Sequence, residues 1–509
     1  MKLKENNSFT YLTYPISFLI LFCMLFPLTS CKEDDPGKVE EEETILTVSA
    51  TSLHFTEEGG TLPIQVTSNA VWKFDFEAGL WSRPSIHTTK GNATVNIVAD
   101  ENETTEERTM TLTLTSKGAE DITITITQDA SDPDPEEPVI ADSIDPDNTS
   151  MRDLTSVQFT ELMGIGWNLG NSMEAINVSG STYTGNETSW GNPIVNKTLI
   201  DAVKAAGFNT LRIPASWSHM VDDEATFHIR YTWKLRVEEV INYALDNDMY
   251  VILNIHWDGG WMNHPTFDDQ TEINTKLAAF WKQIAKHFRD YDDHLLFAGT
   301  NEVHVENDFG TPSAENAEVQ NSFNQTFVNT VRATGGRNTY RHLIIQAYNT
   351  NIEHGVNYLT IPDDNTDDRL MVEVHFYDPY QFTLQGDGVA LWGKEHEGSP
   401  AHSGWGDEDW TDQAFDMVKT NFVEAGYGVI LGEYGALLRN NPQNTTYEEH
   451  VEARNYYLNY VTSAALEHGM VPVYWDNGYT GDNSFGLFNR STGAQAHPDA
   501  IQAIVSADE

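Results

Sequence analysis

The chain has 509 residues, which is longer than one average domain and predicts two or three folded units. Its 29 basic and 77 acidic residues give a formal net charge of −48, and a surface of that sign repels phosphate backbones and acidic polysaccharides. Nucleic acid is therefore excluded as an expected partner and a neutral substrate is favoured, although the same charge also serves solubility.

The N-terminus has the pattern of a secretory signal. Basic residues at positions 2 and 4 precede an apolar stretch over residues 16–28, and small residues follow at a cleavage site. The sequence Leu-Thr-Ser-Cys that ends at Cys31 resembles a bacterial lipobox, in which the cysteine becomes the lipidated first residue. We therefore expect residues 1–30 to be a lipoprotein signal peptide and Cys31 to be the lipidation site. An uncleaved membrane anchor is the alternative.

The residues after Cys31 indicate where the protein is attached. Residues 32–35 resemble the acidic tag of lipoproteins that are exported to the outer cell surface, and residues 31–44 are predicted to be an acidic spacer. We expect the protein to be attached to the outer membrane through its lipid anchor only and to face the cell exterior. The other cysteine, Cys23, lies in the segment that is removed, which excludes a disulfide, a cysteine nucleophile and a thiol metal ligand from the mature chain.

Residues 45–130 alternate between apolar and polar side chains with a period of two, which is typical of antiparallel strands. The clearest runs, rich in Thr, Val and Ile, are residues 46–48, 62–66, 93–97, 110–114 and 122–126. With Trp72, Arg108 and the closing Gln128, this predicted sandwich resembles the BACON family of immunoglobulin-like modules. The resemblance implies either sugar binding or a spacer role, and the spacer is favoured because Trp72 and Trp81 are few aromatics for a binding face.

An acidic, proline-rich stretch over residues 131–150 predicts an extended linker. Residues 151–509 then alternate apolar runs with helical patterns such as residues 199–206, 276–288 and 456–468. The predicted strands are residues 164–168, 208–212, 250–254, 295–299, 343–346, 370–374, 428–431 and 471–475. Eight strand-helix repeats predict a (β/α)₈ TIM barrel, so the expected fold class is α/β, with a small all-β immunoglobulin-like sandwich ahead of the barrel.

Polar and aromatic side chains follow nearly every predicted barrel strand, and active sites of such barrels lie at the carboxyl ends of the strands. These side chains are Arg212, His256, Asn301, Glu302, His375, Tyr377, Glu433 and Trp475. Any one of them alone could be an ordinary strand cap or a packed residue. Two glutamates that arrive together with these partners are hard to obtain by chance, and the set therefore predicts an active site at this end of the barrel.

The same residues resemble those of glycoside hydrolase family 5. The matching motifs are residues 166–171, 188–193, 206–214, 254–256, 300–302, 374–377, 432–435 and 474–476. The resemblance covers about residues 162–499 and looks like the subfamily of endo-β-1,4-glucanases that includes xyloglucanases. It implies a retaining enzyme that hydrolyses internal bonds of a neutral plant β-glucan and needs no cofactor or metal.

The resemblance assigns a role to each of the two carboxyl groups. It implies that Glu302 is the acid/base and Glu433 the nucleophile, about 5 Å apart as retaining hydrolysis requires. Because two charges at that distance are costly, we expect the raised pKa to belong to Glu302.

The resemblance also supplies a substrate-binding set. Arg212 and Tyr377 are expected to hold the nucleophile ionised, and Asn301 is expected to bind the 2-hydroxyl of the sugar. His256 and His375 position hydroxyls and the acid, and Trp475 offers a flat face to the ring. Asn168 and Trp257 complete the predicted substrate-binding residues.

Two positions depart from the family pattern, and both bear on the substrate more than on the reaction. Val303 follows the acid where proline is usual, and Trp257 stands where many members have a second histidine. The preferred glucan is left open between xyloglucan, mixed-linkage β-glucan and cellulose. The alternative readings are an endo-β-mannanase or another family 5 hydrolase, and a catalytically inactive surface glycan-binding lipoprotein.

Six tryptophans fall in or near predicted loops, where some could stack on sugars and others belong to the core. They are Trp190, Trp217, Trp257, Trp261, Trp392 and Trp405. The sequence has no His-Glu-x-x-His motif, phosphate loop or Gly-x-Ser-x-Gly elbow, so neither a metal nor a cofactor is indicated. A monomer is the expected oligomeric state.

Overall fold

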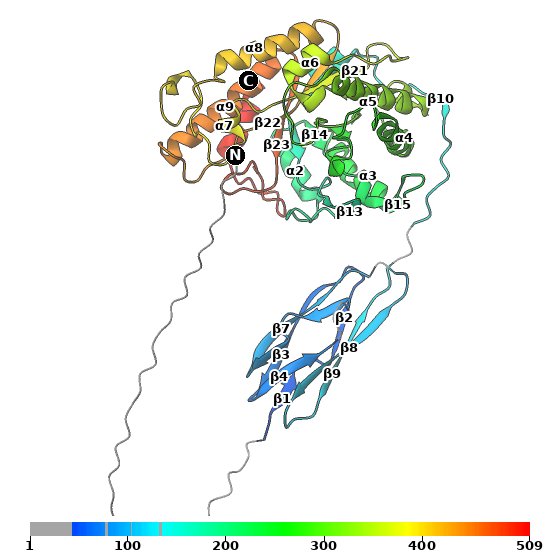
Figure 1. Cartoon of the computed structure of the whole chain (residues 1–509), viewed down its shortest axis with the longest axis vertical. Helices are drawn as coiled ribbons and strands as arrows, with labels where there is room; N and C mark the ends of the chain where they lie inside the picture. The colour runs from blue at the N-terminus through cyan, green and yellow to red at the C-terminus, as the bar shows by residue number, and fades with distance from the viewer. Residues whose placement is uncertain (1–42, 77–79, 103, 132–134, 509) are drawn as a thin grey trace, which may run out of the picture. The chain divides into compact units, whose positions relative to one another are not determined.

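The computed structural model describes residues 43–76, 80–102, 104–131 and 135–508, and the chain forms two compact units, Met1–Pro133 and Asp134–Glu509 (Figure 1). The expected signal peptide, the lipidation site Cys31 and nearly all of the expected spacer lie outside the described residues. Among the residues that are described, no helix combines the length and apolar character that crossing a bilayer requires.

The first unit is a β-sandwich, drawn in blue in Figure 1. One sheet has the order β1 (Leu46–Val48), β3 (Gly60–Ser68), β7 (Ala93–Ala99), β5 (Ser82–Pro84). The other has the order β2 (Ser52–Phe55), β9 (Ile122–Gln128), β8 (Arg108–Ser116), β4 (Val71–Asp75), β6 (Thr88–Lys90). Alternate residues such as Ile64, Val66, Ile124 and Ile126 are buried between the sheets, which confirms the predicted all-β unit.

Both tryptophans of the sandwich are occupied by contacts within it. Trp72 is buried in the core and its indole N–H donates to the carbonyl of Gly91 at 2.8 Å. Trp81 is half-buried, and the guanidinium of Arg108 lies over its ring, 4.6 Å from the centroid. Trp72 is thus unavailable to a sugar and Trp81 is covered by Arg108 on one face, while the spacer role stays a prediction.

The second unit is a closed eight-stranded parallel barrel, which confirms the predicted TIM fold. Its strands, in barrel order, are β11 (Gly166–Leu169), β14 (Thr210–Ile213), β17 (Tyr250–Asn254), β18 (Leu295–Ala298), β20 (Leu343–Gln346), β21 (Leu370–Phe376), β22 (Gly428–Tyr434) and β23 (Met470–Asp476). β11 and β23 close the barrel, with Gly166 paired to Val473. Every strand is buried, because helices cover the outside and side chains fill the inside.

Ten α-helices belong to this unit among the described residues. They are α1 (Ser156–Met163), α2 (Lys197–Ala205), α3 (Tyr231–Leu245), α4 (Gln270–His287), α5 (Ala314–Ala333), α6 (Ile352–Tyr358), α7 (Tyr380–Thr383), α8 (Glu408–Val418), α9 (Tyr447–Glu467) and α10 (Pro498–Val505). Thr155, Ser313 and Thr446 begin α1, α5 and α9 with capping boxes. Two short hairpins are β12 (Asn177–Ser179) with β13 (Thr182–Thr184), and β15 (Val221–Asp223) with β16 (His228–Ile229).

The interior of the barrel is apolar at one end and polar at the other. Phe159 and Met163 of α1 pack with Ile252, Leu296 and Val473, which point inward from the strands, in one buried cluster. This plug closes the amino-terminal end of the barrel and leaves the inward-facing polar residues at the carboxyl end of the strands. The polar end of the barrel is therefore the carboxyl end of the strands, where the site is predicted.

Part of the predicted linker is attached to the barrel unit. Glu137 forms ion pairs with Lys234 at 2.5 Å and with His228 at 2.9 Å, and Asp142 bonds the ammonium groups of Lys282 and Lys286. The strand β10 (Ile144–Pro146) pairs with β19 (Gly335–Gly336). Acidic residues of the predicted linker, which were expected only to repel one another, thus pair with lysines on α3 and α4.

Candidate active site

The predicted catalytic residues meet at the carboxyl end of the barrel. Arg212 lies on β14, His375 on β21, Glu433 on β22 and Trp475 on β23, while His256 follows β17 and Asn301 and Glu302 follow β18. Carboxylate oxygens of Glu302 and Glu433 and a ring nitrogen of His375 all lie within 4.8 Å of one another. Segments far apart in sequence therefore place two carboxyl groups at bonding distance from a single sugar.

Glu433 is held by one donor on each of its oxygens. The guanidinium of Arg212 donates to Oε1 at 3.0 Å, and the hydroxyl of Tyr377 donates to Oε2 at 3.0 Å. Burial and the charge of Glu433 raise the pKa of Tyr377 well above its usual value, so the phenol stays protonated and keeps donating. These two bonds fix the carboxylate and favour its ionised form.

Arg212 and Asn168 lie inside the barrel beside the nucleophile, and their assignment as substrate-binding residues stays a prediction. Both side chains are fully buried. Arg212 also donates to Oδ1 of Asn168 at 2.9 Å and to Oδ1 of Asn301 at 2.7 Å. The Asn168 amide N–H donates to the carbonyl of Gly432 at 2.9 Å. Arg212 thus orients Glu433 and Asn301 directly, and Asn168 supports Arg212.

Asn301 and His256 keep their donor atoms for a ligand. The Asn301 oxygen accepts from Arg212, which leaves its amide N–H groups to donate, as the predicted bond to a 2-hydroxyl requires. Burial and the charges of Arg212 and His375 hold the pKa of His256 well below its usual value. Since Nδ1 of this neutral ring accepts from the amide of Asn254 at 3.2 Å, Nε2 carries the proton.

Trp475 packs against His256 and depends on a glycine for its position. The two rings are parallel, with centroids 5.8 Å apart and planes 6° apart. A Cβ atom on Gly170 would lie 2.8 Å from the Trp475 ring, so a larger residue there would displace the indole. The glycine of the first barrel motif therefore supports the flat face predicted for sugar stacking.

Glu302 is the more open of the two carboxyl groups, with 37% of its side chain exposed against 7% for Glu433. Its Oε1 lies 2.6 Å from Nδ1 of His375. Burial opposes charge on His375, but the carboxylates of Glu433, Glu302 and Glu373 outweigh it and raise the pKa of the imidazole to about 9. The acid predicted at this position therefore shares a short hydrogen bond with a ring that holds a proton.

The expected distribution of pKa values is wrong for this arrangement. Burial raises the pKa of Glu302, but the hydrogen bond from His375 and the charge of Arg212 lower it below its usual value. Burial raises the pKa of Glu433 by more than His375 and Arg212 lower it. The prediction considered two carboxyl groups alone, whereas the site has a third proton carrier, His375, bonded directly to Glu302.

Glu373 is a buried carboxyl group of this site that the sequence analysis did not select. It lies on β21, is fully buried, and contacts Arg212 at 2.9 Å and His375 at 3.2 Å. The charge of Arg212 and the bond from His375 overcome the effect of burial and lower its pKa to about 2. A charged residue inside an otherwise apolar strand was the available signal, because a buried carboxylate needs paired partners.

Glu302 lines two cavities. A cavity of about 160 Å³ is lined by His256, Trp257, Asn301, Val303 and His304. A larger one of about 670 Å³ is lined by Phe309, His375, Tyr377, Tyr380 and Trp410. Both positions that depart from the family pattern, Trp257 and Val303, thus lie in the smaller cavity beside the acid.

The six loop tryptophans differ in how far they are buried. Trp217 and Trp392 are fully buried and belong to the core. Trp261 is half-buried and lies 4.5 Å from the ammonium of Lys276. Trp257 and Trp405 are exposed, and Trp190 lies 6.5 Å from Trp257, so these three remain available to a polysaccharide.

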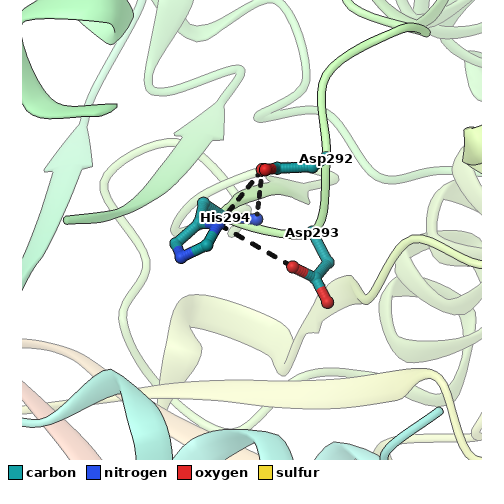
Figure 2. A group of neighbouring side chains, drawn as sticks. All are labelled: Asp292, Asp293 and His294. Atoms are coloured by element: carbon teal, nitrogen blue, oxygen red, sulfur yellow. Dashed lines mark hydrogen bonds and ion pairs between the residues drawn. The ribbon is translucent and has the colours of Figure 1, made fainter. Parts of the chain in front are cut away.

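Two groups of side chains in the described part of the chain have metal-ligating geometry. One is Glu302, His375 and Glu433 of the site itself. The other is Asp292, Asp293 and His294, which come just before β18 (Figure 2). There the carboxylate of Asp293 pairs with Arg152 at 2.7 Å and Asp292 contacts His294 at 3.1 Å. The group is held together by these partners within the protein.

Comparison with protein families gives two matches. The profile described as "Cellulase (glycosyl hydrolase family 5)" matches residues 174–481. The BACON profile, described as "Putative binding domain, N-terminal", matches residues 73–129.

The chain is also similar to characterised glucanases. It is 41% identical over 500 residues to the xyloglucan-specific endo-β-1,4-glucanase of Bacteroides ovatus, which covers 96% of this chain and 95% of the relative. Endoglucanase A of Paenibacillus barcinonensis is 37% identical over 374 residues, covering 70% of this chain and 90% of the relative.

Solved structures show the same likeness. A Bacteroides ovatus family 5 xyloglucanase in complex with an XXXG heptasaccharide matches with 42% identity and a TM-score of 0.69, covering 91% of this chain and 99% of that chain. A broad-specificity endoglucanase from Ruminococcus champanellensis with bound cellotriose matches with 36% identity and a TM-score of 0.63, covering 70% of this chain and all of that chain.

Proposed function

The chain belongs to glycosyl hydrolase family 5, and from this premise we propose that it cleaves internal β-1,4 bonds of xyloglucan with retention of configuration. It is an enzyme of the endo-β-1,4-glucanase and xyloglucanase type. The observation that supports the stereochemistry is the separation of the two carboxyl groups, whose oxygens lie within 4.8 Å. Retaining enzymes keep these groups about 5–5.5 Å apart, whereas inverting enzymes separate them by about 6.5–9.5 Å to admit a water.

In the first step Glu433 attacks the anomeric carbon and forms a covalent glycosyl-enzyme bond. The bond between that carbon and the glycosidic oxygen breaks, and the oxygen takes the proton from Glu302. Arg212 and Tyr377 hold the attacking carboxylate, and the Asn301 amide donates to the 2-hydroxyl as charge develops on the ring.

In the second step Glu302, now a carboxylate, takes a proton from a water molecule. The hydroxide attacks the anomeric carbon, the bond to Glu433 breaks, and the product leaves with its original configuration. The greater exposure of Glu302 fits this role, because both the leaving group and the water reach the acid from the cleft.

Xyloglucan is the favoured polymer on two grounds. A relative that aligns with 96% of this chain is named as xyloglucan-specific, and a similar Bacteroides ovatus xyloglucanase was solved in complex with the XXXG heptasaccharide. Two cavities that share Glu302 in their linings provide room for sugar units next to the acid. Cellulose-type glucans are the second candidate, because relatives of the barrel alone are named as broad-specificity endoglucanases.

The test is product release from xyloglucan, barley-type mixed-linkage glucan, carboxymethyl cellulose, galactomannan and xylan. The proposal expects oligosaccharides from xyloglucan at the highest kcat/KM, and lower or no release from the unbranched glucans. A higher kcat/KM on carboxymethyl cellulose would contradict the substrate preference. Activity on mannan or xylan alone would contradict the assigned polymer class.

We further propose that the enzyme is exported and attached to the outer membrane through lipidated Cys31. The lipobox-like sequence before Cys31 and the acidic residues after it support this proposal. Fractionation of cells labelled with a radioactive fatty acid tests it. The label is expected in the wild-type membrane fraction and absent from Cys31→Ala, and equal labelling of both chains would contradict the proposal.

A further inference from the structure

Glu373 touches the partners of both catalytic carboxyl groups without touching either group itself. We propose that Glu373 is a positioning residue, which keeps the catalytic proton in the hydrogen bond between His375 and Glu302 while it holds Arg212 against Glu433. The inference rests on the proposed retaining hydrolysis and adds a third carboxylate to its machinery.

The contacts of Glu373 form a fork, whose two arms are Arg212 and His375. Its Oε1 forms an ion pair with Nη2 of Arg212 at 2.9 Å and accepts a hydrogen bond from Nε2 of His375 at 3.2 Å. Arg212 continues to Glu433 through Nη1, and His375 continues to Glu302 through Nδ1 at 2.6 Å. One buried oxygen therefore fixes the donors that reach both reacting groups.

The other oxygen of Glu373 is also fixed. Oε2 accepts from the amide N–H of Gln346 on β20 at 2.7 Å. The Gln346 oxygen accepts from the backbone N–H of Thr300 at 2.8 Å, one residue before Asn301. Gln346 thereby connects Glu373 to the loop that carries the acid, so both oxygens of Glu373 are fixed by partners within the barrel.

Gly432 shows how closely Glu373 packs beneath the nucleophile. A Cβ atom on this residue, which directly precedes Glu433, would lie 2.1 Å from Oε1 and 2.7 Å from Cδ of Glu373. Only glycine leaves space for the carboxylate at this point of β22. The chain thus makes room for a third acidic group in the centre of its site.

The fork fixes which nitrogen of His375 carries a proton. Glu373 is fully buried and its low pKa keeps it ionised, so it can only accept, and Nε2 of His375 must donate to it. One proton then remains for the 2.6 Å bond between Nδ1 and Glu302. The leaving group takes this proton in the first step, and water restores it in the second.

Several other groups act on the same proton. The charged and titratable side chains that face His375 and Glu302 are Arg212 from β14, His256 after β17, His304 after Glu302, Tyr377 after β21 and Glu433 on β22. Of the acidic groups among the partners of His375, Glu373 alone bonds Nε2. Removing its charge therefore lowers the pKa at which the His375–Glu302 pair loses its proton.

The test compares the wild type with Glu373→Gln on aryl β-cellobiosides whose leaving groups range from dinitrophenol to unsubstituted phenol. Dinitrophenolate departs without protonation, whereas phenolate needs the acid. In the variant, kcat/KM is expected to fall about 100-fold for the phenyl substrate and less than about 10-fold for the dinitrophenyl substrate. The alkaline limb of the pH profile is expected to move to lower pH by about one unit.

Glu187→Gln is the matched control. Glu187 is a carboxyl group with 8% of its side chain exposed, paired with Arg236 at 2.6 Å and without contact to the catalytic residues. Its loss is expected to leave both the leaving-group dependence and the alkaline limb of the wild type unchanged. A uniform fall of Glu373→Gln across all leaving groups, with an unmoved alkaline limb, would show a structural role and overturn the inference.

A conservative variant keeps the test decisive if Glu373→Gln does not fold. Glu373→Asp retains the charge but shortens the reach, so the same dependence on the leaving group is expected with a smaller amplitude, and the alkaline limb stays near that of the wild type. A uniform loss in Glu373→Asp would also overturn the inference. Failure of the wild type to cleave any substrate would instead contradict the proposed function, and it is measured separately.

Discussion

Tyr377 donates to one oxygen of Glu433 at 3.0 Å while Arg212 donates to the other at the same distance. The carboxylate is therefore held in one orientation before any substrate arrives, and its lone pairs are directed by two protein donors. Such preorganisation favours the charged form of a buried nucleophile and avoids rearrangement during the reaction.

Loss of Tyr377 is expected to act on the nucleophile. Tyr377→Phe keeps the ring but removes the hydroxyl that donates to Glu433. We expect kcat/KM to be about 10- to 100-fold lower, because a buried donor to a charged group contributes about 1.5–3 kcal/mol. The loss should arise from weaker ionisation of Glu433 at acidic pH or from a slower covalent step. Kinetics on xyloglucan measure the effect, and an unchanged kcat/KM across the pH range would contradict the assigned contact.

The pH profile should reflect the titration of the site. Activity requires Glu433 charged and the His375–Glu302 pair carrying one proton, so the rate rises as Glu433 loses its proton and falls as the pair loses its proton. The pKa of His375, raised to about 9, places the fall on the alkaline side of neutrality. The measurement is kcat/KM against pH, and a fall that is complete at neutral pH would contradict this assignment.

Gly432→Ala should displace the carboxylate of Glu373 next to the nucleophile. The added methyl group would lie 2.1 Å from Glu373, so the carboxylate or the strand must shift. We expect a loss of about 1–3 kcal/mol in the free energy of unfolding, together with lower activity. Gly481→Ala is the control, because a Cβ at Gly481 meets nothing within 4 Å. Thermal unfolding measures both, and equal stability of the two variants would be inconsistent with this packing.

The sandwich unit is expected to be dispensable for catalysis on soluble polymers. Its tryptophans are engaged by Gly91 and Arg108, and its core is separate from that of the barrel. A chain without residues 45–130 should keep kcat/KM on soluble xyloglucan within about twofold, since no site residue comes from this unit. Retention of the isolated unit on xyloglucan in an affinity gel would instead support a sugar-binding role.

Much of the fold followed from the sequence because its patterns are local. Each barrel strand is a short buried run between turn residues and helical periods, and such runs are recognisable without knowledge of their neighbours. Strands of the sandwich such as β4 and β5 were missed, since they are short and contain charged or proline residues. The docking of residues 137–147 was missed because its ion pairs involve lysines far along the chain.

The site residues that could be predicted from the sequence are those that directly follow an apolar strand. Glu302 and Glu433 follow apolar strands, and the family resemblance, which the family comparison confirms, indicated their partners. The burial of Arg212 and Asn168, and the fork at Glu373, depend on side chains from four strands meeting inside the barrel. No spacing along the chain encodes those contacts, so only the three-dimensional arrangement shows which polar residues face the sugar and which face one another.

The configuration of the first product tests the proposed retaining hydrolysis most directly. Proton NMR of xyloglucan oligosaccharides, recorded in the first minutes of hydrolysis, distinguishes the β from the α anomer before they equilibrate. Because the Glu302 and Glu433 oxygens lie within 4.8 Å, the account predicts that the β anomer forms first. Initial release of the α anomer would show inversion and would contradict the role of Glu433 as the nucleophile.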